Sequence, residues 1–267
     1  MSKIEIAPPS AVEPAADVLG ALIELQDRAA LIAALAGLSP PERIALLRQS
    51  VPGKITMTTG FGMEGQVLLH WIAEQNLDID VVTLDTGRLF PETYELWAET
   101  ERRYGLRVRA IYPERAGLEA LVAKQGINGF YDSPDMRTAC CNVRKVAPLE
   151  RALDGAKAWI TGLRADQSAF RAQASVLTFD TARRLLKLNP LFDWTRDAVE
   201  DFAAANNVPV NKLHAQGFVS IGCAPCTRAI APGEPERAGR WWWEAEGKKE
   251  CGLHLPRAAA EARAATP

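Results

Sequence analysis

This sequence of 267 residues has no long apolar stretch, no excess of charge of either sign and no internal repeat. No run of about 18 uncharged apolar residues could span a membrane, and the N-terminus has no apolar signal core followed by a small-residue cleavage site. We therefore expect a soluble, cytoplasmic protein without membrane contact. A net charge of −2 excludes a nucleic-acid binder that works by bulk charge, so any anion site must be a local cluster of cations.

Cysteine is scarce as well. The chain has five, an odd number. Because thiols stay reduced in the cytoplasm, a group of cysteines there is more often metal-binding or catalytic than a frame of disulfides.

The chain divides into three expected parts. Residues 1–50 form an N-terminal helical extension, in which 1–16 are rich in Pro and Ala and 17–50 contain two helices separated at "SPPER". Ser39 can cap the second of these helices, and proline can open it. Residues 51–232 form the main domain, and residues 233–267 form a mobile C-terminal tail, because Gly, Pro and charge there replace regular periodicity.

Short apolar runs alternate with helical patterns in the main domain. The expected strands are residues 54–59, 79–84, 107–112 and 158–163, and the expected helices are residues 64–76, 91–104, 115–124 and 143–154. A further capped helix is expected in "WTRDAVEDFAAANN". Near-continuous apolar strands between helices indicate an α/β fold, a parallel twisted sheet with helices on both faces. Ligands of such folds bind at the carboxyl ends of the strands.

Three turns that follow expected strands carry Gly with hydroxyl, acidic or Arg side chains, at residues 58–66, 84–93 and 161–173. The first runs from a strand into a helix, so backbone N–H groups and the helix N-terminus there can hold an anion. Glycine-rich turns of this kind also occur for geometric reasons alone.

Four cysteines form two pairs, Cys140 with Cys141 and Cys223 with Cys226. Such a set is typical of a four-thiolate site for zinc or an iron-sulfur cluster. Side chains of successive residues diverge, so an adjacent pair converges poorly on one zinc ion, whereas a 4Fe-4S cube offers a separate iron to each thiolate. The pairing favours the cluster. A Cys-x-Pro-Cys redox motif, a structural zinc site and buried cysteines without a ligand remain alternatives.

Cys251 stands alone in "KKECGLHL". Lys248, Lys249 and His254 would stabilise its thiolate, while Glu250 opposes them. A thiolate on a mobile arm can reach an electrophile, so Cys251 is a candidate nucleophile. The alternative is an incidental exposed cysteine.

Basic residues lie near the expected strand ends and in the tail, where guanidinium groups suit a sulfate or phosphate. They are Arg144 or Lys145, Arg164, Arg171, Arg237 and Arg240. Trp241 to Trp243 form a run that we interpret as an aromatic anchor for the tail.

Six segments occur in an order that resembles a known family: "LDTGRLFPETYEL", "TACCNVRKVAPL", "TGLRADQS", "GCAPCTRAI", "RAGRWWWE" and "KKECGLH". Over residues 50–255 the chain resembles the thioredoxin-dependent sulfonucleotide reductases, the APS/PAPS reductase family, and among them the assimilatory adenylyl-sulfate (APS) reductases. The resemblance implies an adenine-nucleotide hydrolase-like fold related to ATP pyrophosphatases, which agrees with the parallel sheet expected above.

The resemblance implies a reductase that makes sulfite and AMP from adenylyl sulfate, for sulfate assimilation and cysteine biosynthesis. Cys251 would attack the sulfur of the substrate and carry a Cys-S-sulfonate. Thioredoxin, or a glutaredoxin-like donor, would then release sulfite. The implied cofactor is a 4Fe-4S cluster, and the implied assembly is a homo-oligomer.

The resemblance also assigns roles residue by residue. The implied cluster ligands are Cys140, Cys141, Cys223 and Cys226. The implied substrate-binding residues are Thr59, Gly60, Leu84, Asp85, Lys145, Gly162, Arg164, Arg171, Arg237, Arg240 and His254. A PAPS reductase is the nearest alternative, but such enzymes generally lack the four cluster cysteines. A pyrophosphatase-type ATP-dependent nucleotide modifier and a zinc-stabilised binding protein are more distant alternatives, and neither would use a lone tail thiol.

Overall fold

The computed structural model describes residues 26–168, 171–173, 175–244 and 252–253. The chain divides into two compact units, residues 1–37 and 38–267. The first unit holds α2 (Gln26–Ala36), and the second holds every other element given below. The domain boundaries expected at residues 50 and 232 stay predictions.

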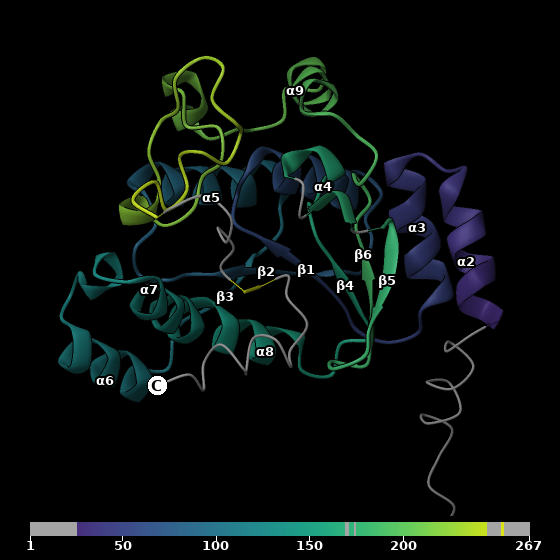
Figure 1. The fold of residues 1–267 in the computed structure, drawn as a ribbon. Coiled ribbons are helices and arrows are strands. Elements are labelled where there is room, and N and C mark those ends of the chain that lie inside the picture. The colour runs from purple at the N-terminus through teal and green to yellow at the C-terminus, as the bar shows by residue number, and fades with distance from the viewer. Residues whose placement is uncertain (1–25, 169–170, 174, 245–251, 254–267) are drawn as a thin grey trace, which may run out of the picture. The chain divides into compact units, whose positions relative to one another are not determined.

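A six-stranded sheet is the centre of the second unit, with the strand order β3-β2-β1-β4-β6-β5 (Figure 1). The strands are β1 (Ile55–Thr59), β2 (Asp80–Leu84), β3 (Arg109–Ile111), β4 (Ala158–Ile160), β5 (Leu177–Asp180) and β6 (Leu185–Leu188). All neighbours pair in parallel except β5 and β6, which form an antiparallel hairpin at one edge. The expected parallel sheet is therefore confirmed, and two strands that were not expected are added to it: β6, parallel to β4, and β5, antiparallel at the edge.

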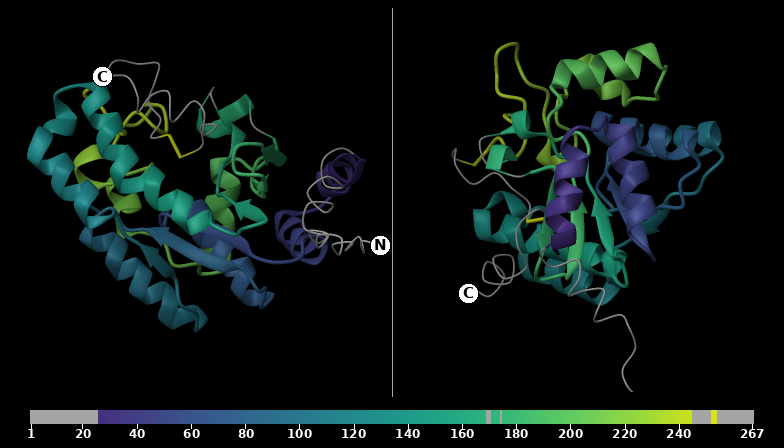
Figure 2. Two further views of the ribbon diagram at one scale, coloured as in Figure 1. Left: turned by 90° about the horizontal axis from the view of Figure 1, so that it is seen from below. Right: turned by 90° about the vertical axis from the view of Figure 1, so that its right-hand side faces the viewer.

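Helices cover both faces of this sheet. They are α3 (Pro40–Ser50), α4 (Met63–Glu74), α5 (Pro91–Tyr104), α6 (Arg115–Gln125), α7 (Pro134–Cys141), α8 (Ala147–Leu153) and α9 (Arg196–Ala205). Helices α4 and α5 lie on one face of the sheet, and helices α6, α7 and α8 lie on the other (Figures 1 and 2). In the central strand β1, Ile55 and Met57 are fully buried, as a strand covered on both faces requires.

The helix expected over residues 143–154 is longer and irregular. It begins as α7, widens into a π-helical turn over Asn142–Val146 and continues as α8. Pro148 explains the wide turn, because it has no N–H to bond the carbonyl of Arg144 and its ring would crowd that carbonyl in a regular α-helix. The turn sets Arg144 and Lys145 directly after the paired cysteines.

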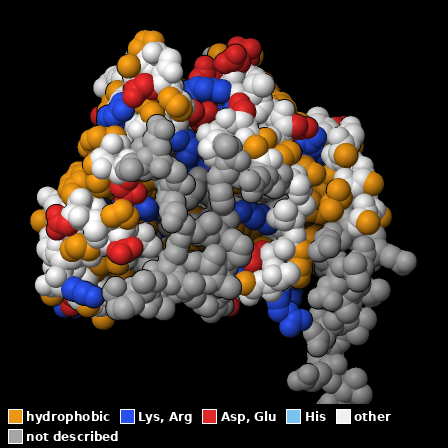
Figure 3. Space-filling model, in the orientation of Figure 1, with side chains coloured by type: hydrophobic (Ala, Val, Ile, Leu, Met, Phe, Trp, Pro, Cys, Tyr) orange, Lys and Arg blue, Asp and Glu red, His pale blue; other side chains and the backbone are white. Residues whose placement is uncertain are grey.

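Polar residues fix the ends of other helices as the sequence predicts. Ser39 is the N-cap of α3, and the Glu42 carboxylate accepts its backbone N–H at 2.8 Å. The Thr195 hydroxyl caps α9 by accepting the N–H of Ala198 at 3.2 Å. None of the helices in the described ranges is both long and apolar enough to cross a membrane. Among the described residues visible in Figure 3, acidic and basic side chains are mixed.

One ion pair joins α3 to the loop after β6. Arg43, buried on α3, donates to both carboxylate oxygens of Asp193 at 2.6 Å and to the carbonyl of Pro190 at 2.8 Å. These hydrogen bonds lower the pKa of Asp193 although its partial burial opposes them. Because the folded-state pKa is depressed, the pair contributes stability above the ordinary pKa of Asp193, and this contribution is lost as pH falls through the lowered value.

We expect Asp193→Asn to lower the free energy of unfolding by about 0.5–1 kcal/mol at neutral pH, a small effect because the Asp193 side chain is half exposed to water. The difference from the wild type should shrink on acidification below about pH 4. Urea unfolding at several pH values measures both. Asp132→Asn, at an exposed position, is the control and should show no such trend. A difference that is independent of pH would contradict this account of the pair.

Candidate active site

A cavity of about 240 Å³ lies at the carboxyl ends of β1, β2 and β4. Its lining comes from the turns after these strands, from the π-helical turn and from the segments around residues 219–223 and 236–241. Nine of the residues predicted from the sequence line it: Thr59, Gly60, Leu84, Lys145, Gly162, Arg171, Cys223, Arg237 and Arg240. The structure therefore brings the separate motifs to one place.

Two close contacts of the Thr59 hydroxyl, one with Phe61 and one with Gly65, fix the turn between β1 and α4. Thr59 accepts the N–H of Phe61 on its hydroxyl at 3.0 Å, and a Cβ on Gly65 would lie only 2.6 Å from that same oxygen. Phe61 takes a left-handed backbone conformation, φ 57°, which is uncommon for a residue with a side chain. A Cβ on Gly162 would lie 3.0 Å from the Cβ of Glu64, so the turns after β1 and β4 nearly touch.

Asp85 shapes the turn after β2 and does not line the cavity. Its carboxylate accepts the N–H of Gly87 and the hydroxyl of Tyr94, both at 2.8 Å. Burial, together with the hydrogen bond to Asp85, raises the pKa of Tyr94 to about 12. Leu84, the preceding residue, does line the cavity.

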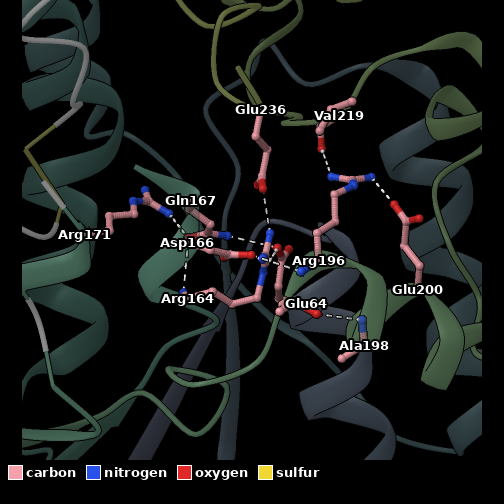
Figure 4. A network of polar contacts seen from close by, with 11 residues as sticks. Glu64, Arg164, Asp166, Gln167, Arg171, Arg196, Ala198, Glu200, Val219 and Glu236 are labelled. Atoms are coloured by element: carbon pink, nitrogen blue, oxygen red, sulfur yellow. Dashed lines mark hydrogen bonds and ion pairs between the residues drawn. The ribbon is translucent and has the colours of Figure 1, made fainter. Parts of the chain in front are cut away.

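Arg164 is fully buried and is absent from the cavity lining. Its guanidinium donates to Glu64 at 2.9 Å, to Glu236 at 2.7 Å and to Asp166 (Figure 4). Glu64 is also held by Gln167 at 2.9 Å. Burial would raise the pKa of Glu64, but Arg164 and these hydrogen bonds keep it below its usual range. Arg164 thus holds carboxylates, and its predicted role in substrate binding stays a prediction.

Three of the four paired cysteines meet in one apolar cluster. Cys223 and Cys226 are buried there with Phe130 and Trp241, and Cys140 packs against them. Cys141, buried on α7, instead accepts a hydrogen bond from Arg137. As expected for neighbours in sequence, Cys140 and Cys141 have different surroundings.

Cations oppose the burial of these thiols. Burial alone would raise the pKa of Cys223, but Lys145, the Thr86 hydroxyl 3.2 Å away and Arg240 together lower it. Burial and the charge of Cys223 raise the pKa of Cys226 to about 11. Cys223 is therefore the preferred thiolate of the two.

An isolated antiparallel bridge between Thr227 and Arg240 holds the backbone of Arg240. The N–H of Arg228 donates to Gly239 at 3.0 Å, and the N–H of Trp241 donates to Cys226 at 3.2 Å. A Cβ on Gly222 would lie 2.3 Å from the Arg240 guanidinium, so a side chain there would displace that group. Trp241 is 1% exposed and lies under Arg240, with 4.8 Å between guanidinium and ring. The predicted aromatic anchor is thus confirmed for Trp241 and for Trp243, which packs against the same cluster, whereas Trp242 is exposed.

Two predicted residues, Cys251 and His254, lie outside the described residues. Between them, Gly252 is buried with φ 92°, and Leu253 lines the cavity. Leu253 also packs against an apolar cluster that includes Leu149 and Trp159. The chain two residues beyond the candidate nucleophile therefore reaches the cavity.

Comparison with known proteins agrees with these motifs. The model of the phosphoadenosine phosphosulfate reductase domain matches residues 54–229. The chain belongs to this family. The adenosine 5'-phosphosulfate reductase of Agrobacterium fabrum is 52% identical over 229 residues, which cover 86% of this chain and 88% of that protein. The enzyme of the same name from Allochromatium vinosum is 51% identical over 200 residues, 75% of this chain and 78% of that one.

A solved structure shares the fold. It is that of the phosphoadenylyl-sulfate (PAPS) reductase of Candida auris, which has a TM-score of 0.63 at 25% identity, over 83% of this chain and all of that one. The resemblance and the fold class expected from the sequence are confirmed.

Several residues that line the cavity were not predicted from the sequence, above all Glu64, Gln167 and Glu236. The sequence does contain a hint for Glu64. A carboxylate next to a turn that is suited to binding an anion needs a cation beside it, so an ion pair of Glu64 could have been predicted. Glu236 gave no such signal, since its partner is 72 residues away in the chain.

Another buried pair supports the anchor. Arg137, which lies 4.8 Å from the Trp241 ring, donates to Glu244 at 2.6 and 3.1 Å, and both side chains are almost fully buried. We expect Glu244→Ala to lower the free energy of unfolding by about 3 kcal/mol, because it leaves a buried guanidinium without its carboxylate.

Urea unfolding measures this loss. Glu119→Ala, which breaks the exposed pair of Glu119 with Arg115, is the control and should change stability by less than about 0.5 kcal/mol. Equal effects of the two substitutions would refute the structural role of the buried pair.

Proposed function

We propose that this protein reduces adenosine 5'-phosphosulfate (adenylyl sulfate, APS) to sulfite and AMP. The observation that carries the proposal is one cavity that several motifs line together. They are the turn between β1 and α4, the cations Lys145, Arg171, Arg237 and Arg240, the thiol of Cys223, and Leu253, which is two residues from Cys251. Relatives that are about half identical over most of both chains carry the name of this activity.

The first step is a transfer of a sulfonate group to Cys251. Its thiolate attacks the sulfur of APS, an S–S bond forms, and the bond from sulfur to the phosphate oxygen breaks. AMP leaves with the electron pair, and Cys251 becomes a Cys-S-sulfonate. Both the thiolate and the substrate are anions, so their repulsion must be offset where negative charge accumulates.

The basic residues of the cavity supply that offset. Lys145, Arg171, Arg237 and Arg240 all line it. Fixed cations in a site that excludes water stabilise the developing charge on phosphate and sulfonate oxygens without reorganising. The turn from Thr59 to Gly65, at the start of α4, is available for the nucleotide itself.

The second step needs an external dithiol, thioredoxin or a glutaredoxin-like protein. Its thiolate attacks the sulfur of Cys251, and sulfite leaves with the electron pair of the broken S–S bond. The resulting mixed disulfide is resolved by the second thiol of the donor, which leaves as a disulfide while Cys251 returns to the thiol. Two electrons pass from the donor to the sulfonate sulfur.

Cys140, Cys141, Cys223 and Cys226 are the residues that would hold a 4Fe-4S cluster. Their surroundings fit such a group: three share an apolar, buried cluster and the fourth is the chain neighbour of one of them. When bound, the cluster supplies negative charge next to Lys145 and Arg240.

The alternative substrate is the 3'-phosphorylated nucleotide, PAPS. The solved relative from Candida auris is named for it, but at 25% identity, whereas the relatives that are about half identical are named for APS. We therefore favour APS, and an assay of both nucleotides with reduced thioredoxin separates the two activities.

The sulfonate step can be tested alone. Incubation with APS and no reductant should add the mass of one sulfonate group to the peptide that contains Cys251, because nothing is present to release it. Mass spectrometry of the protease digest measures this. Cys251→Ser should remain unmodified and produce no sulfite, and an unmodified wild-type Cys251 would refute the proposed mechanism.

The cofactor has a separate test. Protein purified without oxygen should contain iron and sulfide and be brown, and replacing Cys140 or Cys223 by Ser should lower the iron content, because each would lose a ligand. Cys251→Ser is the matched control, since it removes the fifth cysteine but no proposed ligand, and it should retain iron. Iron retained in all three variants, or absent from the wild type, would overturn the assignment of the ligands.

A further inference from the structure

One guanidinium links three distant segments of the chain beneath the cavity. Arg164 follows β4, Glu64 lies in the first turn of α4, and Glu236 belongs to the segment 233–244. Arg164 is bonded to both carboxylates, at 2.9 and 2.7 Å, and its side chain is entirely buried, whereas those of Glu64 and Glu236 are 17% and 16% exposed. Figure 4 shows Glu236 pointing down to Arg164 from a different part of the chain than Glu64.

This bond is one of several that hold the segment 233–244. Before it, Glu234 pairs with Arg228 at 2.7 Å, and after it, the N–H of Arg228 donates to Gly239 at 3.0 Å and the N–H of Trp241 donates to the carbonyl of Cys226 at 3.2 Å. Between Pro235 and Arg240 the backbone folds back on itself, since the N–H of Ala238 donates to Pro235 at 2.8 Å and that of Arg240 donates to Arg237 at 3.0 Å. Arg237 and Arg240 both line the cavity, and Arg237 directly follows Glu236, so the bond to Arg164 is the side-chain attachment next to it in the chain.

The two members of the Arg164–Glu236 pair differ in how firmly the rest of the structure holds them. Arg164 remains charged at any ordinary pH and cannot leave its buried position without separating from three carboxylates. Glu236, in contrast, has no other hydrogen bond to the described residues. Arg164 is thus the fixed partner, and Glu236 is the group by which the segment is attached to it.

We propose that Glu236 is a positioning residue for the reaction: by binding Arg164 it holds the segment 233–244 so that Arg237 and Arg240 face the anionic part of the substrate. The proposal rests on the proposed function for the identity of the substrate, but not for the attachment itself. Glu236 acts through the two arginines and does not contact the reacting atoms.

Kinetics should separate positioning from general stability. We expect Glu236→Ala to raise the KM for APS about tenfold or more while the thermal midpoint of unfolding changes little, because Arg164 keeps Glu64 and Asp166 as partners. Glu236→Gln retains an acceptor for the Arg164 N–H but not the charge, so its KM should fall between those of Glu236→Ala and the wild type.

Hydrogen exchange tests the attachment without any activity. In the protein without nucleotide, Glu236→Ala should make the amides of residues 237–241 exchange about tenfold faster than in the wild type, because the segment loses the side-chain attachment that directly precedes these residues. Glu200→Ala is the matched control. Glu200 pairs with Arg196 in the same network, but on α9 and partly exposed, so exchange in 237–241 should not change.

The outcomes are distinguishable. Unchanged exchange in Glu236→Ala, or equal acceleration in Glu200→Ala, would overturn the proposal, as would faster exchange with an unchanged KM. If the wild type forms no sulfite from APS, the proposed function fails, while the exchange experiment still decides whether Glu236 holds the segment.

Discussion

The site depends on a cation placed where water cannot reach it. A buried guanidinium is stable only when carboxylates surround it with good geometry, and Arg164 meets this requirement with Glu64, Asp166 and Glu236. Because these partners come from the first turn of α4, the turn after β4 and the C-terminal segment, satisfying one charge brings three separate parts of the chain together. The cavity at the carboxyl ends of the strands lies beside this arrangement, and Glu64 and Glu236 are part of its lining.

A second constraint comes from a single proline. Pro148 is incompatible with a regular helix through Arg144, and the resulting π-helical turn sets Lys145 on the cavity. Cys140 lies just before that turn and packs against Cys223 and Cys226. A local backbone defect therefore places a cation and a thiol on the same side of the molecule, next to the loop of the second cysteine pair. Wide turns of this kind are frequent at functional sites.

The central strands could be predicted because strands buried on both faces are continuous apolar runs, as in β1, β2 and β4. The β5–β6 hairpin could not, since Lys187 and the charged loop at Arg183 and Arg184 give it the composition of a surface loop. Its place is set by pairing of β6 with β4, a long-range contact. The same limit applies to Arg164: the sequence indicates a cation after a strand, but not that Glu236 would bind it.

The buried network also matters for the charge that a ligand meets. Glu64 and Glu236 line the cavity, and two carboxylates there would repel an anion and weaken the attraction of Lys145, Arg171, Arg237 and Arg240. Arg164 offsets them from below, at hydrogen-bonding distance, where the low dielectric makes its charge most effective. The cations that line the cavity are then left to act on the ligand. A residue that need not touch the substrate thereby determines how strongly the residues around the substrate can attract it.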